Sequence, residues 1–219
     1  MSASSSTYSF WSKRLMSLLG IVPLGVYVVL HLWTNVSSLG GPAAWDAALA
    51  ASRSHPGFLL LEILLGLALL IHTVVGLQLL RRWRPNNLQV RTFSNLKFFL
   101  QRLAGLGVGL FVVAHVIKAR ILPALSPAGK ESWHGMREAL SEPVTLTVYI
   151  LGLLGVSYHL ANGLWTALIT WGVTVSERAQ RRSQWVAAAL FVLLLILSGL
   201  SIYGFLQPWP PAQAQLVLQ

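Results

Sequence analysis

The chain has 219 residues, of which 55% are apolar and only 10% are charged, and its mean hydropathy is +0.64. Because about a quarter of the residues in a soluble domain are charged, this composition excludes an ordinary soluble globular enzyme. The absence of cysteine excludes disulfide bridges, thiolate-bound metals and iron–sulfur clusters carried by this chain. A net charge of +10 in so apolar a chain favours the positive-inside bias of a membrane protein over a nucleic-acid partner.

Five apolar segments follow one another, each bounded by charged residues, prolines or tryptophans. An isolated strand cannot satisfy its backbone polar groups in lipid, and the segments lack the alternation of a β-barrel, so each is predicted to be a helix. The sequence therefore predicts an all-α fold, an integral membrane bundle of five transmembrane helices. The predicted spans are Leu15–Val36, Gly57–Leu80, Phe98–Leu122, Pro143–Trp171 and Trp185–Leu206.

The transmembrane domain is predicted to occupy residues 13–207. Residues 1–12 are rich in serine and are expected to be frayed, and residues 208–219 are expected to form an outer C-terminal tail. Lys13 and Arg14 before an apolar run are also typical of a signal peptide. However, the run is about 20 residues long and no small-residue cleavage site comes after it, which predicts a retained first span.

Lysine and arginine are distributed unequally between the two ends of the predicted spans. One end carries eleven of them and the other end carries five. Since the cytoplasmic loops of membrane proteins are enriched in these residues, the end with eleven is predicted to be cytoplasmic. The N-terminus is then cytoplasmic and, after five crossings, the C-terminus lies outside.

Four of the six histidines lie inside four different spans. At 1.5 Å per residue, His31 and His115 lie about 25 and 20 Å from the cytoplasmic boundary, in the outer half of the membrane. His72 lies about 14 Å from that boundary, and His159 falls near the middle of the membrane or just inside it. Depth therefore pairs His31 with His115 as an outer couple and His72 with His159 as an inner couple.

Short sequence matches sort the histidines into the same couples. Around the outer couple, residues 25–32 (GVYVVLHL) match residues 109–116 (GLFVVAHV). Around the inner couple, residues 72–77 (HTVVGL) match residues 159–164 (HLANGL). The first two spans and the next two are thus predicted to form an internal two-fold repeat, to which the fifth span is added.

Paired imidazoles inside a membrane point to a bound metal. A lone membrane histidine is more often an interhelical hydrogen-bonding residue, but an unpartnered imidazole in lipid costs several kcal/mol. Two neutral rings that face each other across a bundle form an axial ligand pair for haem iron, whereas two distant pairs do not supply a four-ligand zinc site. Gly76 and Gly163, one turn after the inner histidines, are predicted to let a flat macrocycle approach the helix.

At these residues the chain resembles the cytochrome b subunit of succinate:quinone oxidoreductases, the dihaem five-helix class found in succinate dehydrogenases and fumarate reductases. The resemblance runs from about Ser9 to Phe205. It rests on the stretches Arg14–Gly25 leading to His31, His72–Leu77, Gln101–Gly105 leading to His115, and Tyr158–Trp165.

The resemblance implies two haem b groups, with His72 and His159 holding the one near the cytoplasm and His31 and His115 the outer one. It implies an FAD-containing subunit and an iron–sulfur subunit on the cytoplasmic side, facing the basic inner loops 81–97 and 178–182. It also implies a membrane quinone, expected to be menaquinone, and a place in the bacterial cytoplasmic membrane. Because protein fills both axial positions, this chain would transfer electrons, and succinate or fumarate chemistry would lie on a partner subunit.

The resemblance also suggests where quinone and haem propionates bind. Glu62 is the only carboxylate inside a span, so it is either the acidic residue of a quinone site near the outer haem or a cap at the interface. Lys118 is the candidate propionate partner at the outer haem, and Ser17 and Arg102 are the candidates at the inner haem, with interface anchoring as the alternative role. Some family members carry a glutamate, linked to proton movement, where this chain has Ser157, which leaves that route in doubt.

Two other functions fit the same residues. The first is a dihaem cytochrome b that serves a formate dehydrogenase or a hydrogenase, where the partner and the electron donor differ. The second is a transporter or channel whose membrane histidines carry protons or metal.

Overall fold

The computed structural model of the chain describes residues 3–209 except 83, 85, 87–88, 90 and 127–130. Within this part of the chain every regular element is a helix, and five helical stretches are long and apolar enough to cross a membrane. The predicted all-α fold with five membrane-spanning helices is confirmed. From residue 210 onward, the predicted C-terminal tail lies outside the described residues. The five stretches are Phe10–Arg53, Phe58–Arg81, Phe93–Leu125, Pro143–Thr170 and Glu177–Leu206.

The first stretch is not one uniform helix. α1 (Ala3–Leu19) leads into a π-helical turn, η1 (Gly20–Gly25), which is followed by α2 (Val26–Val36). Pro23 lies inside the π turn. Because proline has no backbone N–H, it cannot complete the α-helical hydrogen bond to the residue four positions earlier. Helix also begins at Ala3, so it extends into the N-terminal stretch that was expected to be frayed.

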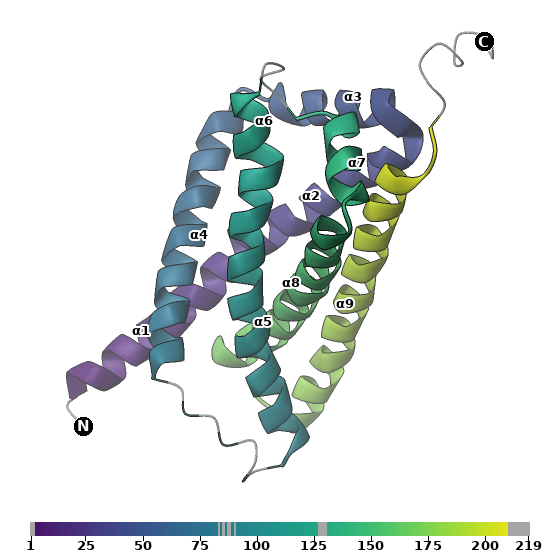
Figure 1. Ribbon diagram of the computed structural model, residues 1–219. Coiled ribbons are helices and arrows are strands. Elements are labelled where there is room, and N and C mark those ends of the chain that lie inside the picture. Colours follow the sequence, from purple (N-terminus) through teal and green to yellow (C-terminus); the bar gives the residue numbers. More distant parts are fainter. Residues whose placement is uncertain are drawn as a thin grey trace.

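Two helices cover the end of the bundle that is opposite the N-terminus (Figure 1). A 3-10 turn, η2 (Ser37–Gly40), leads into α3 (Gly41–Arg53), and α7 (Trp133–Ser141) packs against α3. Gly41 allows the chain to turn into α3, because its φ is 81° and a β-carbon there would lie 2.6 Å from the ring of Trp209. This layer closes one end of the bundle.

The remaining spans alternate in direction along the chain (Figure 1). α4 (Phe58–Arg81) and α8 (Pro143–Thr170) run toward the end where the N-terminus lies. α5 (Phe93–Val116), with its continuation through η3 (Ile117–Ile121) and α6 (Leu122–Leu125), runs the other way, as does α9 (Glu177–Leu206). α8 is central, since it packs against both α5 and α9. We call the two ends of the bundle the N-terminal end and the C-terminal end.

The main buried cluster lies at the C-terminal end and joins the covering helices to the spans. It holds α3 and α7 against the ends of α5, α8 and α9, and a β-carbon at Gly152 of α8 would overlap the ring of Phe111 from α5. The close contact of a glycine with an aromatic ring lets α5 and α8 approach each other. The buried members are Trp45, Phe111, Trp133, Leu140, Tyr149 and Phe205.

The outward faces of the spans are apolar. In α4 the leucines at positions 59, 60, 64, 67 and 70 are all more than half exposed. An exposed apolar surface of this extent is unfavourable in water and favourable in lipid. The surface of the bundle therefore agrees with the membrane location that the composition predicted.

Candidate functional site

The four histidines inside the spans lie as two pairs. His31 of α2 and His115 of α5 have ring centres 5.8 Å apart, with ring planes at 80° to each other. His72 of α4 and His159 of α8 have ring centres 6.2 Å apart, with planes at 90°. The first pair, called the outer pair, lies toward the C-terminal end, where α2 and α5 finish, and the second, the inner pair, lies toward the N-terminal end, where α4 and α8 finish.

The separations within the two pairs fit a metal ion between the rings. Two bonds of about 2 Å from iron to nitrogen, and about 1 Å from each nitrogen to its ring centre, place two axial imidazoles about 6 Å apart. In the described part of the chain, no group of three or more histidine or acidic side chains could hold a metal ion without a cofactor. Haem needs only two protein ligands, because its porphyrin supplies four nitrogens, so the residues present fit a bis-histidine haem at each pair.

The inner pair is oriented by backbone carbonyls. Nδ1 of His72 donates to the carbonyl oxygen of Met16 at 2.9 Å, and Nδ1 of His159 donates to that of Gln101 at 3.2 Å. A carbonyl oxygen only accepts, so each bond places the proton on Nδ1 and leaves the lone pair of Nε2 for a metal; at His159 the Gln101 side-chain nitrogen also lies 3.2 Å from Nδ1. The Gln101 side chain also donates to the carbonyl of His159 at 3.1 Å and accepts from Asn162 at 2.8 Å, which holds α5 against α8.

The outer pair is surrounded by polar side chains. The Tyr149 hydroxyl lies 3.2 Å from Nδ1 of His115, and the Tyr27 hydroxyl lies 3.5 Å from Nδ1 of His31. The Asn35 side-chain amide lies 3.3 Å from Nε2 of His31, so a metal bound at Nε2 would replace this contact. None of these partners was predicted from the sequence. Tyr27 and Asn35 stand four residues before and after His31, on the same helix face, and that spacing could have revealed them.

Two glycines make room for the rings of the inner pair. A β-carbon at Gly20 would lie 2.7 Å from Cε1 of His72, and one at Gly105 would lie 2.9 Å from Cε1 of His159. From the sequence, a related role was predicted for Gly76 and Gly163. Their β-carbon positions lie 3.9 Å from the sulfur of Met16 and 3.5 Å from Nε2 of Gln101, respectively. The close contacts with the rings therefore come from η1 and α5, which carry neither of the inner histidines.

Glu62 forms an ion pair across two helices. Its two carboxylate oxygens accept from Nη2 of Arg120 in η3 at 3.2 and 3.3 Å, and the two side chains are 37% and 47% exposed. Glu62 has no cation nearby in sequence, and Arg120 was not predicted as its partner because it stands 58 residues away. A second pair, Arg53 with Glu131 at 2.8 Å, joins α3 to the loop before α7, where burial raises the pKa of the Glu131 carboxyl and Arg53 opposes that rise.

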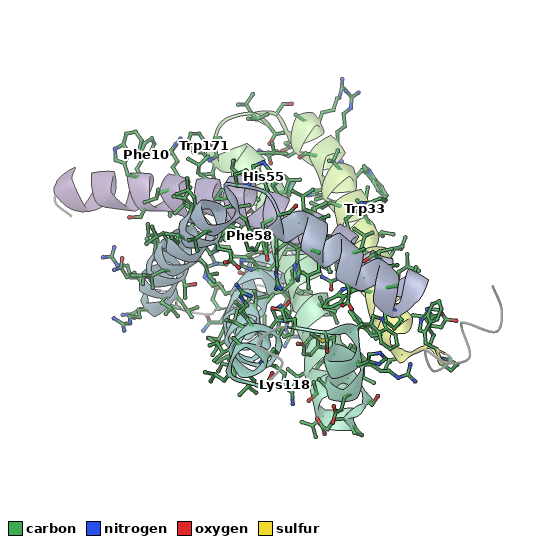
Figure 2. All side chains as sticks on the ribbon, turned by 90° about the horizontal axis from the view of Figure 1, so that it is seen from above. Phe10, Trp33, His55, Phe58, Lys118 and Trp171 are labelled. Atoms are coloured by element: carbon green, nitrogen blue, oxygen red, sulfur yellow. The ribbon has the colours of Figure 1, made fainter. Side chains whose placement is uncertain are left out.

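Ser17 lies in a cluster at the N-terminal end. Its hydroxyl donates to the carbonyl of Arg14 and accepts from Nε1 of Trp171, each at 2.9 Å. The Arg14 guanidinium lies 3.6 Å from the centre of the Phe10 ring and 5.9 Å from the Trp171 ring. Figure 2 shows Phe10 and Trp171 beside each other on this flank. Aromatic and cationic side chains of this kind anchor a helix at a membrane interface.

The other two candidate propionate partners lie near the ends of α5 and its continuation. Arg102 lies one residue after Gln101, and its guanidinium lies 3.4 Å from the centre of the Phe98 ring. Lys118 is exposed and lies at the edge of the bundle when this is viewed from the C-terminal end (Figure 2).

No protein-family model matches the chain. It is, however, similar to the succinate dehydrogenase cytochrome b558 subunit of Bacillus subtilis (strain 168), with 35% identity over 202 residues. The match covers 92% of this chain and 99% of that protein. The chain belongs to the cytochrome b family of succinate:quinone oxidoreductases. As a membrane-anchoring cytochrome b subunit of a succinate dehydrogenase, it is a multi-pass protein of a bacterial membrane, in agreement with its five spans.

Membership of this cytochrome b family implies haem, which agrees with the fit of the two histidine pairs. It favours this assignment over a cytochrome b of formate dehydrogenase or hydrogenase and over a histidine-dependent transporter. Ser157, at the position where some family members carry a glutamate, is fully buried, and its hydroxyl donates to the carbonyl of Leu153 at 2.7 Å. In this subunit the position therefore carries a hydroxyl that is satisfied within its own helix.

Proposed function

We propose that this cytochrome b subunit binds two haem b groups, one between His31 and His115 and the other between His72 and His159. The supporting observation is that the ring centres of the pairs are 5.8 and 6.2 Å apart, on four different helices. When bound, haem supplies one-electron transfer, which in this subunit would connect an iron–sulfur subunit with membrane quinone.

In this proposal, hydrogen bonds within the protein orient the histidine rings, and these rings would fill the ligand positions of the haem iron. The carbonyls of Met16 and Gln101 keep the proton on Nδ1 of the inner histidines, so that Nε2 is the ligand atom. With two histidines holding each haem, the protein itself would supply both ligands that the porphyrin does not, so neither oxygen nor a substrate would find a coordination site. This arrangement supports electron transfer alone, with the oxidation of succinate or the reduction of fumarate on a partner subunit.

The proposed partners are an FAD-containing subunit and an iron–sulfur subunit at the N-terminal end. The name of the Bacillus subtilis relative as a subunit of succinate dehydrogenase supports a catalytic partner. The excess of lysine and arginine supports a cytoplasmic N-terminal end. At this end Arg178, Arg181 and Arg182 are exposed and provide a basic surface for the iron–sulfur subunit.

The proposed quinone site lies near the outer pair and uses Glu62. This residue lies in the first turns of α4, at the end of the bundle where the outer pair lies, and a carboxylate can exchange the protons of a quinone. Arg120 holds the carboxylate in place until a proton or a quinone competes for it. Menaquinone is the quinone we propose. Lys118 would serve the propionates of the outer haem, and Ser17 and Arg102 those of the inner haem.

Succinate-driven reduction of the cytochrome in membranes tests this function. Succinate should reduce haem in the wild-type complex and reduce added quinone, whereas formate and hydrogen should reduce neither. Glu62→Gln should retain succinate-driven reduction of haem and lose most of its turnover with quinone, because the amide cannot exchange a proton. Haem that responds to formate or hydrogen instead of succinate would contradict the proposed partner, and normal quinone turnover in E62Q would contradict the role of Glu62.

A further inference from the structure

The helices that precede the two outer histidines make equivalent contacts with the inner pair. In the first stretch, the carbonyl of Met16 in α1 accepts from His72, and Gly20, four residues later at the start of η1, faces the same ring. In α5, the Gln101 carbonyl accepts from His159, and Gly105, again four residues later, faces that ring. Each helix thus contacts an inner histidine through one carbonyl and one glycine, one turn apart.

Beyond these contacts the two helices differ in length by one residue. His31 stands eleven residues after Gly20, whereas His115 stands ten residues after Gly105. Each residue of an α-helix turns the side-chain direction by about 100°, so an extra residue would turn His31 by that angle relative to His115. The two rings nevertheless face each other, with centres 5.8 Å apart.

The π turn η1 lies within the longer of the two stretches. η1 covers Gly20–Gly25, between the inner contact and His31, while α5 stays α-helical from Gly105 to Val116. A π turn holds one more residue than an α turn, so it takes up a single inserted residue without changing the side-chain directions of the next helical turns. Pro23 sits inside it, where the absence of a backbone N–H suits a break in the α-helical hydrogen bonds.

We infer that the π turn at Gly20–Gly25 is a positioning element that brings His31 into register with His115 while Met16 and Gly20 stay on His72. The first helical stretch therefore contacts the inner site through its backbone and the outer site through the imidazole of His31. It does so although it has one more residue between these two contacts than α5 has. The inference rests on the proposed haem pairs, because register matters only if both sites must be filled by the same helix.

Three variants, each studied within the complex, distinguish the effect of the number of residues before the outer histidine from the effect of proline itself. Deletion of Pro23 places the histidine ten residues after Gly20, as His115 is after Gly105 in α5, so the π turn should become α-helical and both haems should remain. Pro23→Ala keeps the count, so it should also retain both haems. Deletion of Gly107, whose β-carbon position has no atom within 4 Å, should turn His115 away and remove the outer haem alone. The readouts are haem content per purified complex and the spectroscopic signals of the two haems in a redox titration.

The outcomes distinguish this inference from the haem assignment beneath it. Loss of the outer haem, or of both, on deletion of Pro23, while Pro23→Ala keeps both, would overturn the role of the π turn. Loss of the outer haem in Pro23→Ala would also overturn it, because proline itself would then be required. If deletion of Gly107 left both haems in place, the assignment of His115 as a ligand would fail instead.

Discussion

At the scale of single residues, the two histidine pairs differ in what orients their rings. The inner rings lie against backbone carbonyls, which only accept and which no side-chain substitution removes, and the Gln101 side-chain amide also lies 3.2 Å from Nδ1 of His159. The outer rings contact the hydroxyls of Tyr149 and Tyr27, which can donate or accept. Groups beyond the first ligands tune a metal site, so the outer site should be the one that responds to conservative side-chain changes.

We predict that Tyr149→Phe changes the outer haem and leaves the inner haem unaffected. Removing the hydroxyl deprives Nδ1 of His115 of its partner, which should shift the midpoint potential of the outer haem by on the order of tens of millivolts. The matched control is Tyr203→Phe, because the Tyr203 side chain is 61% exposed. A redox titration that resolves the two haems measures both values, and an equal shift in both would argue against a local contact.

The residues of the site differ in how well the sequence predicts them. The four histidines stand out because imidazoles are rare inside apolar runs, and their depths follow from the rise of a helix. Tyr149 could not be found in the same way, because it contacts His115 across 34 residues from another helix. Arg120 was missed as the partner of Glu62 for the same reason.

At the scale of the helix, glycines determine how closely α1 and α5 approach the inner rings. A helix interior normally disfavours glycine relative to alanine by about 1 kcal/mol, so its presence needs a local reason. At Gly20 and Gly105 the reason is the histidine ring, which occupies the space of a β-carbon. Gly107, one half-turn further along α5, has open space instead.

Gly105→Ala should therefore weaken the inner haem while Gly107→Ala should not. The new methyl group would lie 2.9 Å from Cε1 of His159, so the ring must shift, and haem affinity at this pair should fall about 10-fold or more. Alanine at position 107 meets no atom within 4 Å and should leave haem binding unchanged. Haem retention during purification and washing measures the difference. Equal retention in the two variants would contradict the contact.

The predictability of the helices depends on where their contacts come from. Long apolar runs predicted the five spans, because lipid imposes both helix and length. α3 and α7 did not emerge from the sequence as separate elements. Their burial depends on aromatic side chains such as Phe205 that come from the far end of the chain. The π turn was not predicted from the sequence, because a single proline does not specify how the helix adapts to it.

At the scale of the whole molecule, an odd number of crossings places the first and last spans' free ends at opposite ends of the bundle (Figure 1). The two histidine pairs lie at different levels between these ends, because the outer pair is near the ends of α2 and α5 and the inner pair is in the later halves of α4 and α8. The inner pair lies toward the end that carries the basic loops, where we propose that the iron–sulfur subunit docks. The outer pair lies toward the end covered by α3 and α7, where we propose that quinone reacts. Charge and histidine depth are both visible in the sequence, whereas the covering layer became evident only from the structure.

Neutralising the arginines in the first turns of α9, a stretch that was expected from the sequence to be a loop, should weaken binding of the proposed partner subunits. Replacing Arg178, Arg181 and Arg182 by glutamine removes three exposed positive charges at the N-terminal end. Their loss should slow association of the partner subunits and make the complex dissociate at lower salt. Charges at the rim of an interface act mainly by attracting the partner during encounter, and salt screens this attraction. Co-purification of succinate dehydrogenase activity with the membrane subunit, measured across salt concentrations, tests this. Unchanged co-purification at every salt concentration would place the docking surface elsewhere.

The central claim is that two histidine pairs each hold one haem, and haem content in single-ligand variants tests it most directly. The wild-type subunit, purified within its complex, should contain two haems per chain. His31→Ala and His115→Ala should each remove the same haem, and His72→Ala and His159→Ala the other, as identified by their separate redox signals. A colourless wild-type subunit from cells supplied with iron and porphyrin, or a His31→Ala variant that lost the haem missing from His72→Ala, would contradict the account.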